Sequence, residues 1–225
     1  MQRVIEFSLG EYYHIYNRGV DKRIIFLDNC DKDRFQKLLF LCNASMPANF
    51  RDVQGVPYAL IKRGSPVVAI GAYCLMDNHF HILLKEIEEG GISKFMSKLS
   101  TAYSMYFNIK HTRSGALFEN NFKAKHLDTD EYLKYIFSYI HLNPVKLIDP
   151  NWKAEGIKDV DRAKDYLLSY RYSSYTDFLC QDRVNEKLLL SLKEFPEYFN
   201  DEKSFEGHLD DWLNYKEEIS ETEGK

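Results

Sequence analysis

Alternating apolar and polar positions predict a β-hairpin near the middle of the chain. Residues 67–76 are rich in apolar and β-branched side chains, and a turn-forming Asp-Asn pair separates them from a second apolar run at residues 79–85. Side chains at positions i and i+2 of a strand leave the same face of a sheet. His79 and His81 are therefore predicted to lie side by side on one face, with Phe80 pointing into a core on the other.

The rest of the pattern predicts a mixture of strands and helices. Period-2 alternation indicates a strand, and apolar positions three and four residues apart indicate a helix. The order of the elements predicts an α+β fold, with an antiparallel sheet and helices on one or both faces in a ferredoxin-like or RRM-like arrangement. The predicted elements are a strand at residues 11–18, a helix at 31–44 capped by Asp31 or Asp33, an extended connection at 45–66 with a short strand at 58–62, a helix at 92–110, a loop or short strand pair at 113–127, and a helix at 129–142 that is capped by Thr129 and stopped by Asn143-Pro144.

The end of the chain differs in composition from the rest. Residues 1–180 hold 24 basic and 21 acidic side chains, whereas residues 181–225 hold 6 and 13. Apolar positions in the acidic part follow helical spacing. We predict one main domain over residues 1–178 and an acidic helical C-terminal extension over residues 179–225 that packs on it.

Composition limits the classes of protein that fit the sequence. A chain of 225 residues with 44% hydrophobic side chains is predicted to bury a substantial core, which excludes a disordered protein. No apolar run reaches membrane-spanning length and residues 1–6 lack the apolar stretch of a signal peptide, so we expect a cytoplasmic protein without a membrane segment. The four cysteines are far apart, so neither a zinc knuckle nor a disulfide framework is expected. A monomer and a homodimer are both compatible with the sequence.

A basic and aromatic region follows the predicted hairpin. Between residues 90 and 126 the sequence holds six basic side chains and one acidic side chain, Glu119. Such a patch is typical of a surface that binds phosphates, and aromatic rings within it could stack on unpaired bases. The alternative is an ordinary solvated surface. The residues predicted to bind DNA are Lys94, Lys98, Lys110, Arg113, Phe118, Phe122, Lys123 and Lys125.

The helix predicted at residues 129–142 places tyrosines on one face. Tyr132, Tyr135 and Tyr139 lie at positions i, i+3 and i+7, and Asn143 stands one turn beyond Tyr139. Tyrosines in such a pattern are more often part of a core than of a catalytic site. In the same way, an isolated His-x-His pair on a strand is more often polar surface than a metal site. The two patterns become informative because they occur together.

Several motifs together resemble one known family. They are the sequences of residues 13–19 (YHIYNRG), 76–84 (MDNHFHILL), 115–119 (GALFE), 139–146 (YIHLNPVK) and 170–175 (YRYSSY). In order and spacing over residues 10–178 the chain resembles the single-tyrosine HUH transposases, of the REP-associated tyrosine transposase type. Such a set is far more specific than any one of its motifs.

The resemblance implies a metal-dependent enzyme that cuts and rejoins DNA. It implies that His79 and His81 on a central strand are paired metal ligands, that Tyr139 on a facing helix is the nucleophile, and that Asn143 is the third ligand. The implied cofactor is a divalent metal, Mg²⁺ or Mn²⁺, and the implied partner is single-stranded DNA with hairpins. Attack by the tyrosine would give a 5′-phosphotyrosine and a free 3′-hydroxyl, so that a second strand could be joined without ATP.

Two other functions are compatible with parts of the pattern. One is a domesticated protein of the same fold that binds single-stranded nucleic acid and no longer cleaves it. The other is a metal hydrolase in which Asp77 or Glu119 joins the two histidines, although this alternative leaves the tyrosine helix unexplained. The chain also departs from the family in an insert-like stretch at residues 50–66 and in its acidic tail, so the DNA sequence that it recognises does not follow from the resemblance.

Overall fold

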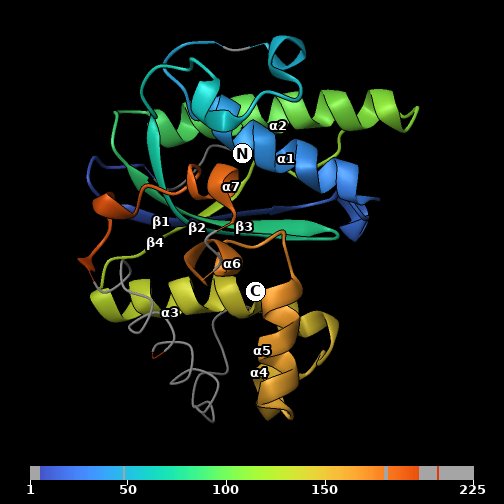
Figure 1. Cartoon of the computed structure of the whole chain (residues 1–225), viewed down its shortest axis with the longest axis vertical. Helices are drawn as coiled ribbons and strands as arrows, with labels where there is room; N and C mark the ends of the chain where they lie inside the picture. The colour runs from blue at the N-terminus through green and yellow to red at the C-terminus, as the bar shows by residue number, and fades with distance from the viewer. Residues whose placement is uncertain (1–5, 48, 180–181, 198–206, 208–225) are drawn as a thin grey trace.

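A four-stranded antiparallel sheet lies at the centre of the structure (Figure 1). The structure is a computed structural model that describes residues 6–47, 49–179, 182–197 and 207. The strand order is β2-β3-β1-β4, so the first strand of the chain lies beside the second strand of the hairpin. The strands are β1 (Tyr12–Arg18), β2 (Val68–Met76), β3 (His79–Glu86) and β4 (Lys123–His126).

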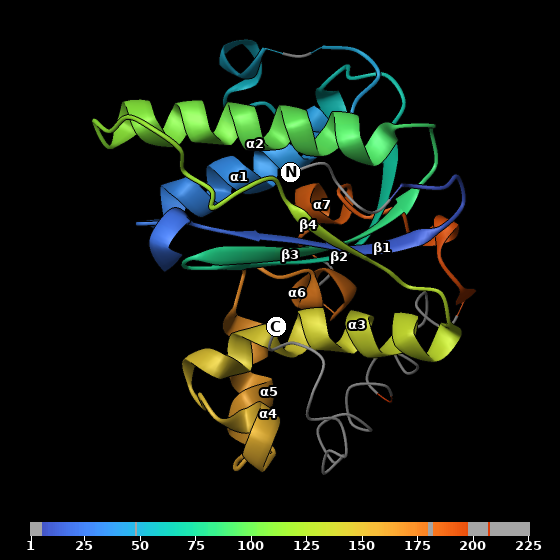
Figure 2. The ribbon, with the colours of Figure 1, turned by 180° about the vertical axis from the view of Figure 1, so that it is seen from behind.

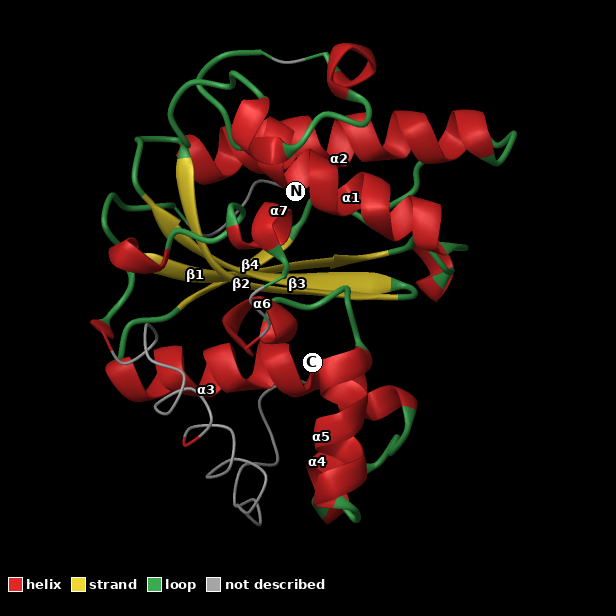
Figure 3. Ribbon diagram, in the orientation of Figure 1, coloured by secondary structure: helices red, strands yellow, loops and turns green. Residues whose placement is uncertain are grey.

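Helices cover both faces of the sheet, which confirms the predicted α+β fold. Figures 1 and 2 show α1 and α2 packed on one face and α3 on the opposite face, and Figure 3 shows the helices on either side of the strands. Among the described residues, none of the helices is long and apolar enough to cross a membrane. The helices are α1 (Asn29–Cys42), α2 (Gly91–Lys110), α3 (Asp130–Leu142), α4 (Trp152–Glu155), α5 (Val160–Ser169), α6 (Tyr175–Leu179) and α7 (Val184–Lys187).

The β2–β3 hairpin is confirmed, with the alternation predicted for its second strand. Phe80 is fully buried, and its ring centroid lies 5.0 Å from that of Phe35 on α1. His81, one residue further along the strand, points the other way, and its ring centroid lies 5.4 Å from that of Tyr139 on α3. The period of two therefore turns Phe80 toward α1 and His81 toward α3.

Two local predictions need correction. The helix cap is Asp28, whose side chain accepts a hydrogen bond from the backbone N–H of Asp31, so the cap lies three residues before Asp31 and five before Asp33. Asp31 is instead buried inside the helix, where it accepts hydrogen bonds from other elements. The short strand predicted at residues 58–62 is the 3-10 turn η3 (Tyr58–Leu60). The Thr129 cap is confirmed, since its hydroxyl accepts from the N–H of Tyr132.

The segment after α5 completes the free edge of β2. The backbone of residues 172–174 forms an isolated antiparallel bridge between Ser173 and Cys74, with hydrogen bonds from Leu75 N to Tyr172 O and from Ser174 N to Tyr73 O. An edge strand exposes unpaired backbone groups unless another segment covers them. The YRYSSY motif therefore has a structural role in covering this edge.

The C-terminal segment packs against the opposite end of β2. Phe195, just after the 3-10 turn η5 (Leu192–Glu194), is buried, and any side chain at Gly71 would clash with its ring. Gly71 lies at a register irregularity between Ile70 and Ala72, where the strand can admit the ring. The described part of the predicted helical extension contains only α7 and η5, and residues 198–206 and 208–225 lie outside the described residues.

Candidate active site

The sheet face toward α3 gathers the polar residues of three strands. In the antiparallel register Tyr16 lies opposite His81, and Lys125 lies opposite His14. Directly opposed residues share a face of the sheet. The imidazole rings of His14 and His81 stack with centroids 5.0 Å apart, and His14 Nε2 and His81 Nδ1 are 2.9 Å apart. The neighbouring strands β1 and β3 thus contribute one continuous polar cluster.

Tyr132, Tyr135 and Tyr139 form a row along helix α3, and the row reaches this cluster at Tyr139. Tyr135 stacks on Tyr139 with ring centroids 6.4 Å apart and planes only 3° apart, and Tyr132 continues the row. This geometry confirms that the three tyrosines share one face of the helix. Tyr139 meets His14 and His81 edge-on, with centroid distances of 6.1 Å and 5.4 Å.

Asn143 lies at the point where α3 passes into the 3-10 turn η4 (Asn143–Leu147). Pro144 cannot donate a backbone hydrogen bond, which ends the α-helical pattern one turn after Tyr139. The Asn143 side chain is buried, and its Nδ2 has no hydrogen-bond partner among the described residues. Asn143 also hydrogen-bonds with His79, and this contact favours the charged form of the imidazole.

All three histidines of the cluster are held in the neutral state. Burial, reinforced by Lys125 and Lys153, lowers the pKa of His14 to about 3. Burial and Lys146 lower the pKa of His79 to about 4, against the opposing effect of Asn143. Burial likewise lowers the pKa of His81 well below its usual range. Neutral imidazoles keep a lone pair, which is the form that can bind a metal ion.

Positive charge surrounds the cluster. Lys153 Nζ lies 4.0 Å from the centroid of the Tyr139 ring, and Lys146 and Lys153 both act on the pKa values of His79 and His81. Neither lysine was among the residues predicted to bind DNA, although Lys146 ends the YIHLNPVK motif, because each becomes a neighbour of the strands only through the folding of η4 and α4. A site with neutral ligands and flanking ammonium groups is suited to an anionic substrate such as a phosphodiester.

The carboxylates of the hydrolase alternative are engaged elsewhere. Glu119 pairs with Arg18, and Asp77 pairs with Lys32 at 2.8 Å. Within the described part of the chain, no three His, Cys, Asp or Glu side chains gather in a way that could hold a metal ion. The residues grouped at the site are three imidazoles, an amide and a phenol, which differ from a hydrolase ligand set that contains a carboxylate.

Four of the residues predicted to bind DNA are held by α2 and the loop after it, away from the tyrosines. Lys94 pairs with Glu88, and Lys98 donates to the backbone carbonyl of Ala44. Lys110 donates to the carboxylates of Asp28 and Asp31 at the start of α1, and Arg113 donates to Asn108 near the end of α2. The structure therefore does not bring these four side chains together with His79, His81 and Tyr139.

Of the other four, the two lysines share the face of the site, whereas the prediction that Phe118 stacks on DNA bases needs correction because its ring is buried on the other face. Phe118 is buried and packs against Phe80 and Tyr103 on the α2 side. Phe122 stacks on Phe7 with centroids 6.2 Å apart. Lys123 and Lys125 stand on β4 opposite Tyr16 and His14, so they share the face that carries the histidines.

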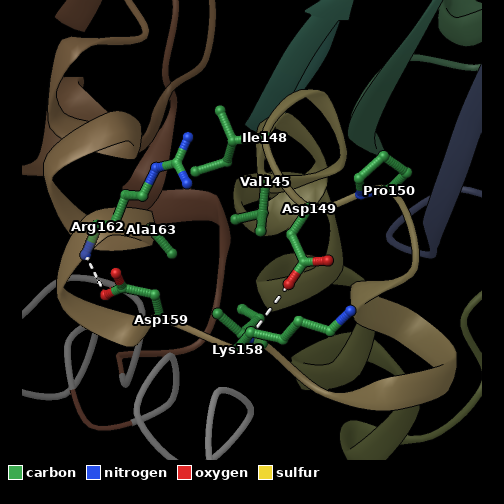
Figure 4. A pocket seen from close by; sticks show the side chains of 9 residues that line it. Val145, Ile148, Asp149, Pro150, Lys158, Asp159, Arg162 and Ala163 are labelled. Atoms are coloured by element: carbon green, nitrogen blue, oxygen red, sulfur yellow. Dashed lines mark hydrogen bonds between the residues drawn. The ribbon is translucent and has the colours of Figure 1, made fainter.

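A cleft of about 270 Å³ lies beside the site but is separate from it (Figure 4). Asp159 caps α5 at its rim by accepting from the N–H of Arg162, and Asp149 accepts from the N–H of Lys158. None of the predicted metal ligands, nor Tyr139, lines it. The lining residues are Val145, Ile148, Asp149, Pro150, Ile157, Lys158, Asp159, Arg162 and Ala163.

Comparison with known proteins found one matching family model and similar solved structures. A family model described as IS200-like transposase matches residues 63–143, a stretch that runs from before β2 to Asn143. The predicted resemblance to tyrosine transposases is confirmed. One solved structure, of a REP-associated tyrosine transposase bound to a REP hairpin, shares the fold with a TM-score of 0.51 and 12% identity, over 80% of this chain and 86% of the other. No curated protein matches the chain. The family match supports a transposase role.

Proposed function

We propose that the protein is a metal-dependent transposase that cleaves and rejoins single-stranded, hairpin-flanked DNA through a 5′-phosphotyrosine at Tyr139. The observation that carries the proposal is the contact between the rings of Tyr139 and His81. His79, on the same strand as His81, also contacts Asn143. The family match and the hairpin named for the structural neighbour support DNA as the substrate.

The proposed chemistry needs one nucleophile and no carboxylate. Tyr139 Oη would attack a backbone phosphorus, forming the P–Oη bond as the P–O3′ bond breaks, and the departing oxygen would take up a proton to become a free 3′-hydroxyl. A phenol is mostly protonated at neutral pH and is then a poor nucleophile. Nearby positive charges favour its ionised form, the phenolate, which is the better nucleophile. Lys153 over the Tyr139 ring supplies one such charge within the protein. Attack by another 3′-hydroxyl on the same ester would reverse the step and join strands.

The residues at the site fit a divalent metal ion. Burial keeps His79 neutral, and Nδ1 of the ring lies 2.6 Å from Asn78 Oδ1, so its proton lies on Nδ1 and the lone pair on Nε2. The buried Asn143 side chain contacts His79, and its Nδ2 has no hydrogen-bond partner among the described residues. An amide beside two neutral imidazoles supplies the nitrogen and oxygen donors that a divalent ion can use. His79, His81 and Asn143 would hold Mg²⁺ or Mn²⁺ there, and the bound ion would supply charge stabilisation for the phosphodiester.

A basic surface on the same face is the proposed contact for the flanking strand. Lys123 and Lys125 project from β4 beside the histidines, while Lys146 and Lys153 lie on the α3 side. A flexible single strand can bring a phosphate into line with Tyr139 more easily than a stiff duplex can. We therefore expect cleavage of single strands and not of blunt duplexes.

The test is cleavage of labelled single-stranded hairpin DNA with Mn²⁺, analysed on a denaturing gel. The wild-type chain should give a free 3′-end together with a protein–DNA adduct, and Tyr139→Phe should give neither while still binding the DNA. Tyr135→Phe is the matched control, because it removes the same oxygen one turn earlier on the same face. The domesticated-protein alternative predicts binding without cleavage by the wild-type chain, and that result would replace our proposal.

A further inference from the structure

Each proposed ligand histidine is held by its Nδ1 atom. His79 Nδ1 lies 2.6 Å from Asn78 Oδ1, and His81 Nδ1 lies 2.9 Å from His14 Nε2. A neutral imidazole has one N–H and one lone pair, so the group bonded to one nitrogen decides what the other nitrogen can do. The partners of Nδ1 therefore bear directly on whether Nε2 can bind a cation.

We propose that Asn78 and His14 are positioning residues that hold His79 and His81 with the proton on Nδ1 and the lone pair on Nε2. This inference rests on the proposed function, because it concerns the same metal site. Ligand histidines usually donate their second N–H to a fixed acceptor, which orients the ring and sets its tautomer. Asn78 and His14 are the two groups placed to serve as these acceptors.

Asn78 can only accept a hydrogen bond from His79. Its amide nitrogen donates to the backbone carbonyl of Lys22 at 3.2 Å, so its oxygen is the atom turned toward His79. An amide oxygen accepts and cannot donate, which places the imidazole proton on Nδ1. Asn78 belongs to the hairpin turn, and the backbone N–H of Gly19 donates to its carbonyl at 2.9 Å. The turn therefore has a second role beyond reversing the chain.

His14 can either donate a hydrogen bond to His81 or accept one from it. Two neutral imidazoles share a single proton between His14 Nε2 and His81 Nδ1, and either ring can be the donor. A cation on His81 Nε2 requires His81 to donate and His14 to accept. His14 then carries its own proton on Nδ1, an atom that is buried and has no hydrogen-bond partner among the described residues. Binding of the cation would thus select one of two tautomer pairs, and His14 makes that selection possible.

The variants follow from these roles. His14→Phe keeps a ring and removes the acceptor, and it should weaken Mn²⁺ binding by about 10–100-fold, the usual cost of losing such a partner. His14→Gln places an amide oxygen near the position of Nε2 and should restore most of the affinity. Asn78→Ala should act like His14→Phe, and Asn78→Asp, which keeps an acceptor, should not. Tyr135→Phe is the control, since it removes a hydroxyl from the same helix face outside the proposed ligand set and should leave Mn²⁺ affinity unchanged.

The experiment combines calorimetric Mn²⁺ titration with ¹⁵N NMR of the histidine rings in the full chain. In the metal-free wild type, His79 should carry its proton on Nδ1, and with Zn²⁺ as a diamagnetic probe both His79 and His81 should do so. A proton on Nε2 of either ring with Zn²⁺ bound would overturn the inference. Unchanged Mn²⁺ affinity in a folded His14→Phe variant would also overturn it. If that variant fails to fold, the wild-type tautomers and His14→Gln still decide.

Failure of this inference is distinguishable from failure of the proposed function. A wild-type chain that forms the Tyr139 adduct, with His14→Phe binding Mn²⁺ normally, would leave the function standing and remove the role of His14. A chain that never forms the adduct, yet shows Nδ1 protonation of both rings with Zn²⁺, would leave the positioning role standing and remove the proposed reaction.

Discussion

The two faces of the sheet show opposite uses of the same strand. On the α1 and α2 side, Phe80 meets Phe35 in a core of aromatic rings. On the α3 side, the residues before and after Phe80 are His79 and His81, which meet an amide and a phenol. Because Phe80 lies between His79 and His81, its burial against α1 fixes the backbone that carries both imidazoles. The positions of the two imidazoles therefore depend on packing on the opposite face of the sheet.

The comparison also concerns polar groups. On the α3 side, buried nitrogen atoms of His14 and Asn143 have no partner among the described residues. On the α1 and α2 side, the buried carboxylate of Asp31 accepts from Leu27 N–H, Lys110 and Tyr106. Unsatisfied buried polar groups cost free energy and are retained mainly where function requires them. Glu86, which accepts from the N–H of Ile92 on α2, also has a buried oxygen without a partner among the described residues. Unsatisfied atoms therefore occur on both faces, and those of His14 and Asn143 are the ones that lie at the candidate site.

The largest effect on stability is expected on the apolar face. Phe80→Ala removes a fully buried ring and should lower the free energy of unfolding by about 3–5 kcal/mol. His79→Ala, one residue away but half-buried, should lower it by no more than about 1 kcal/mol. Urea denaturation of both variants measures the difference. Equal losses would show that the two faces are not divided as we describe.

The order should reverse for metal binding. His79→Ala should lose at least the 10–100-fold in Mn²⁺ affinity that loss of a supporting partner costs, because it removes a proposed ligand itself. His81→Ala should lose affinity too, and it should also reduce stability, since His81 is buried against His14. Calorimetry and a thermal melt of each variant check both effects. Normal Mn²⁺ affinity with a lowered melting temperature would make these histidines structural.

A smaller effect is expected for basic residues, and it should depend on their face. Replacing Lys123 and Lys125 by Ala should make the dependence of single-strand affinity on salt shallower by roughly 0.7 per lost contact. Replacing Lys94 and Lys98, which lie on α2, is the matched control and should leave the slope unchanged. Fluorescence anisotropy over a salt series measures both. A shallower salt dependence in the Lys94 and Lys98 variant alone would indicate that the DNA binds on the α2 side.

The smallest effect is expected from a buried carboxylate away from the site. Burial raises the pKa of Asp177 to about 6, although Arg183 beside it opposes the shift. Because the folded pKa exceeds the unfolded value, the stability that protonation supplies is present below about pH 4 and is lost as the pH rises through 6. Asp177→Asn should therefore gain stability relative to wild type between pH 4 and pH 7, as measured by urea denaturation. Parallel pH profiles would contradict this.

The sequence predicted the elements that depend on local pattern. The hairpin, the strand ahead of Gly19, α2 and the Thr129 cap all follow from periodicity or capping chemistry. The error at residues 58–62 has a local cause, because a short apolar run near Pro57 suits a 3-10 turn as well as a strand.

Features that depend on which strands are neighbours could not be predicted in this way. The position of His14 against His81 requires β1 to lie between β3 and β4, and periodicity does not specify strand order. The separation of Lys94 from Lys125 is also a tertiary feature, since α2 covers one face of the sheet and Lys125 leaves β4 on the other face, opposite His14. The motif that contains His14 was recognised, but its contact with His81 was not.

The central claim is that Tyr139 becomes covalently joined to DNA. After reaction of the full chain with a single-stranded hairpin and Mn²⁺, nuclease and trypsin digestion should leave a nucleotide on the peptide of residues 135–146, which holds both Tyr135 and Tyr139. Fragment-ion mass spectrometry separates the two positions. Our account predicts a 5′-phosphate ester on Tyr139. An ester on Tyr135 or on another tyrosine, or cleaved DNA without any tyrosine ester, would contradict it.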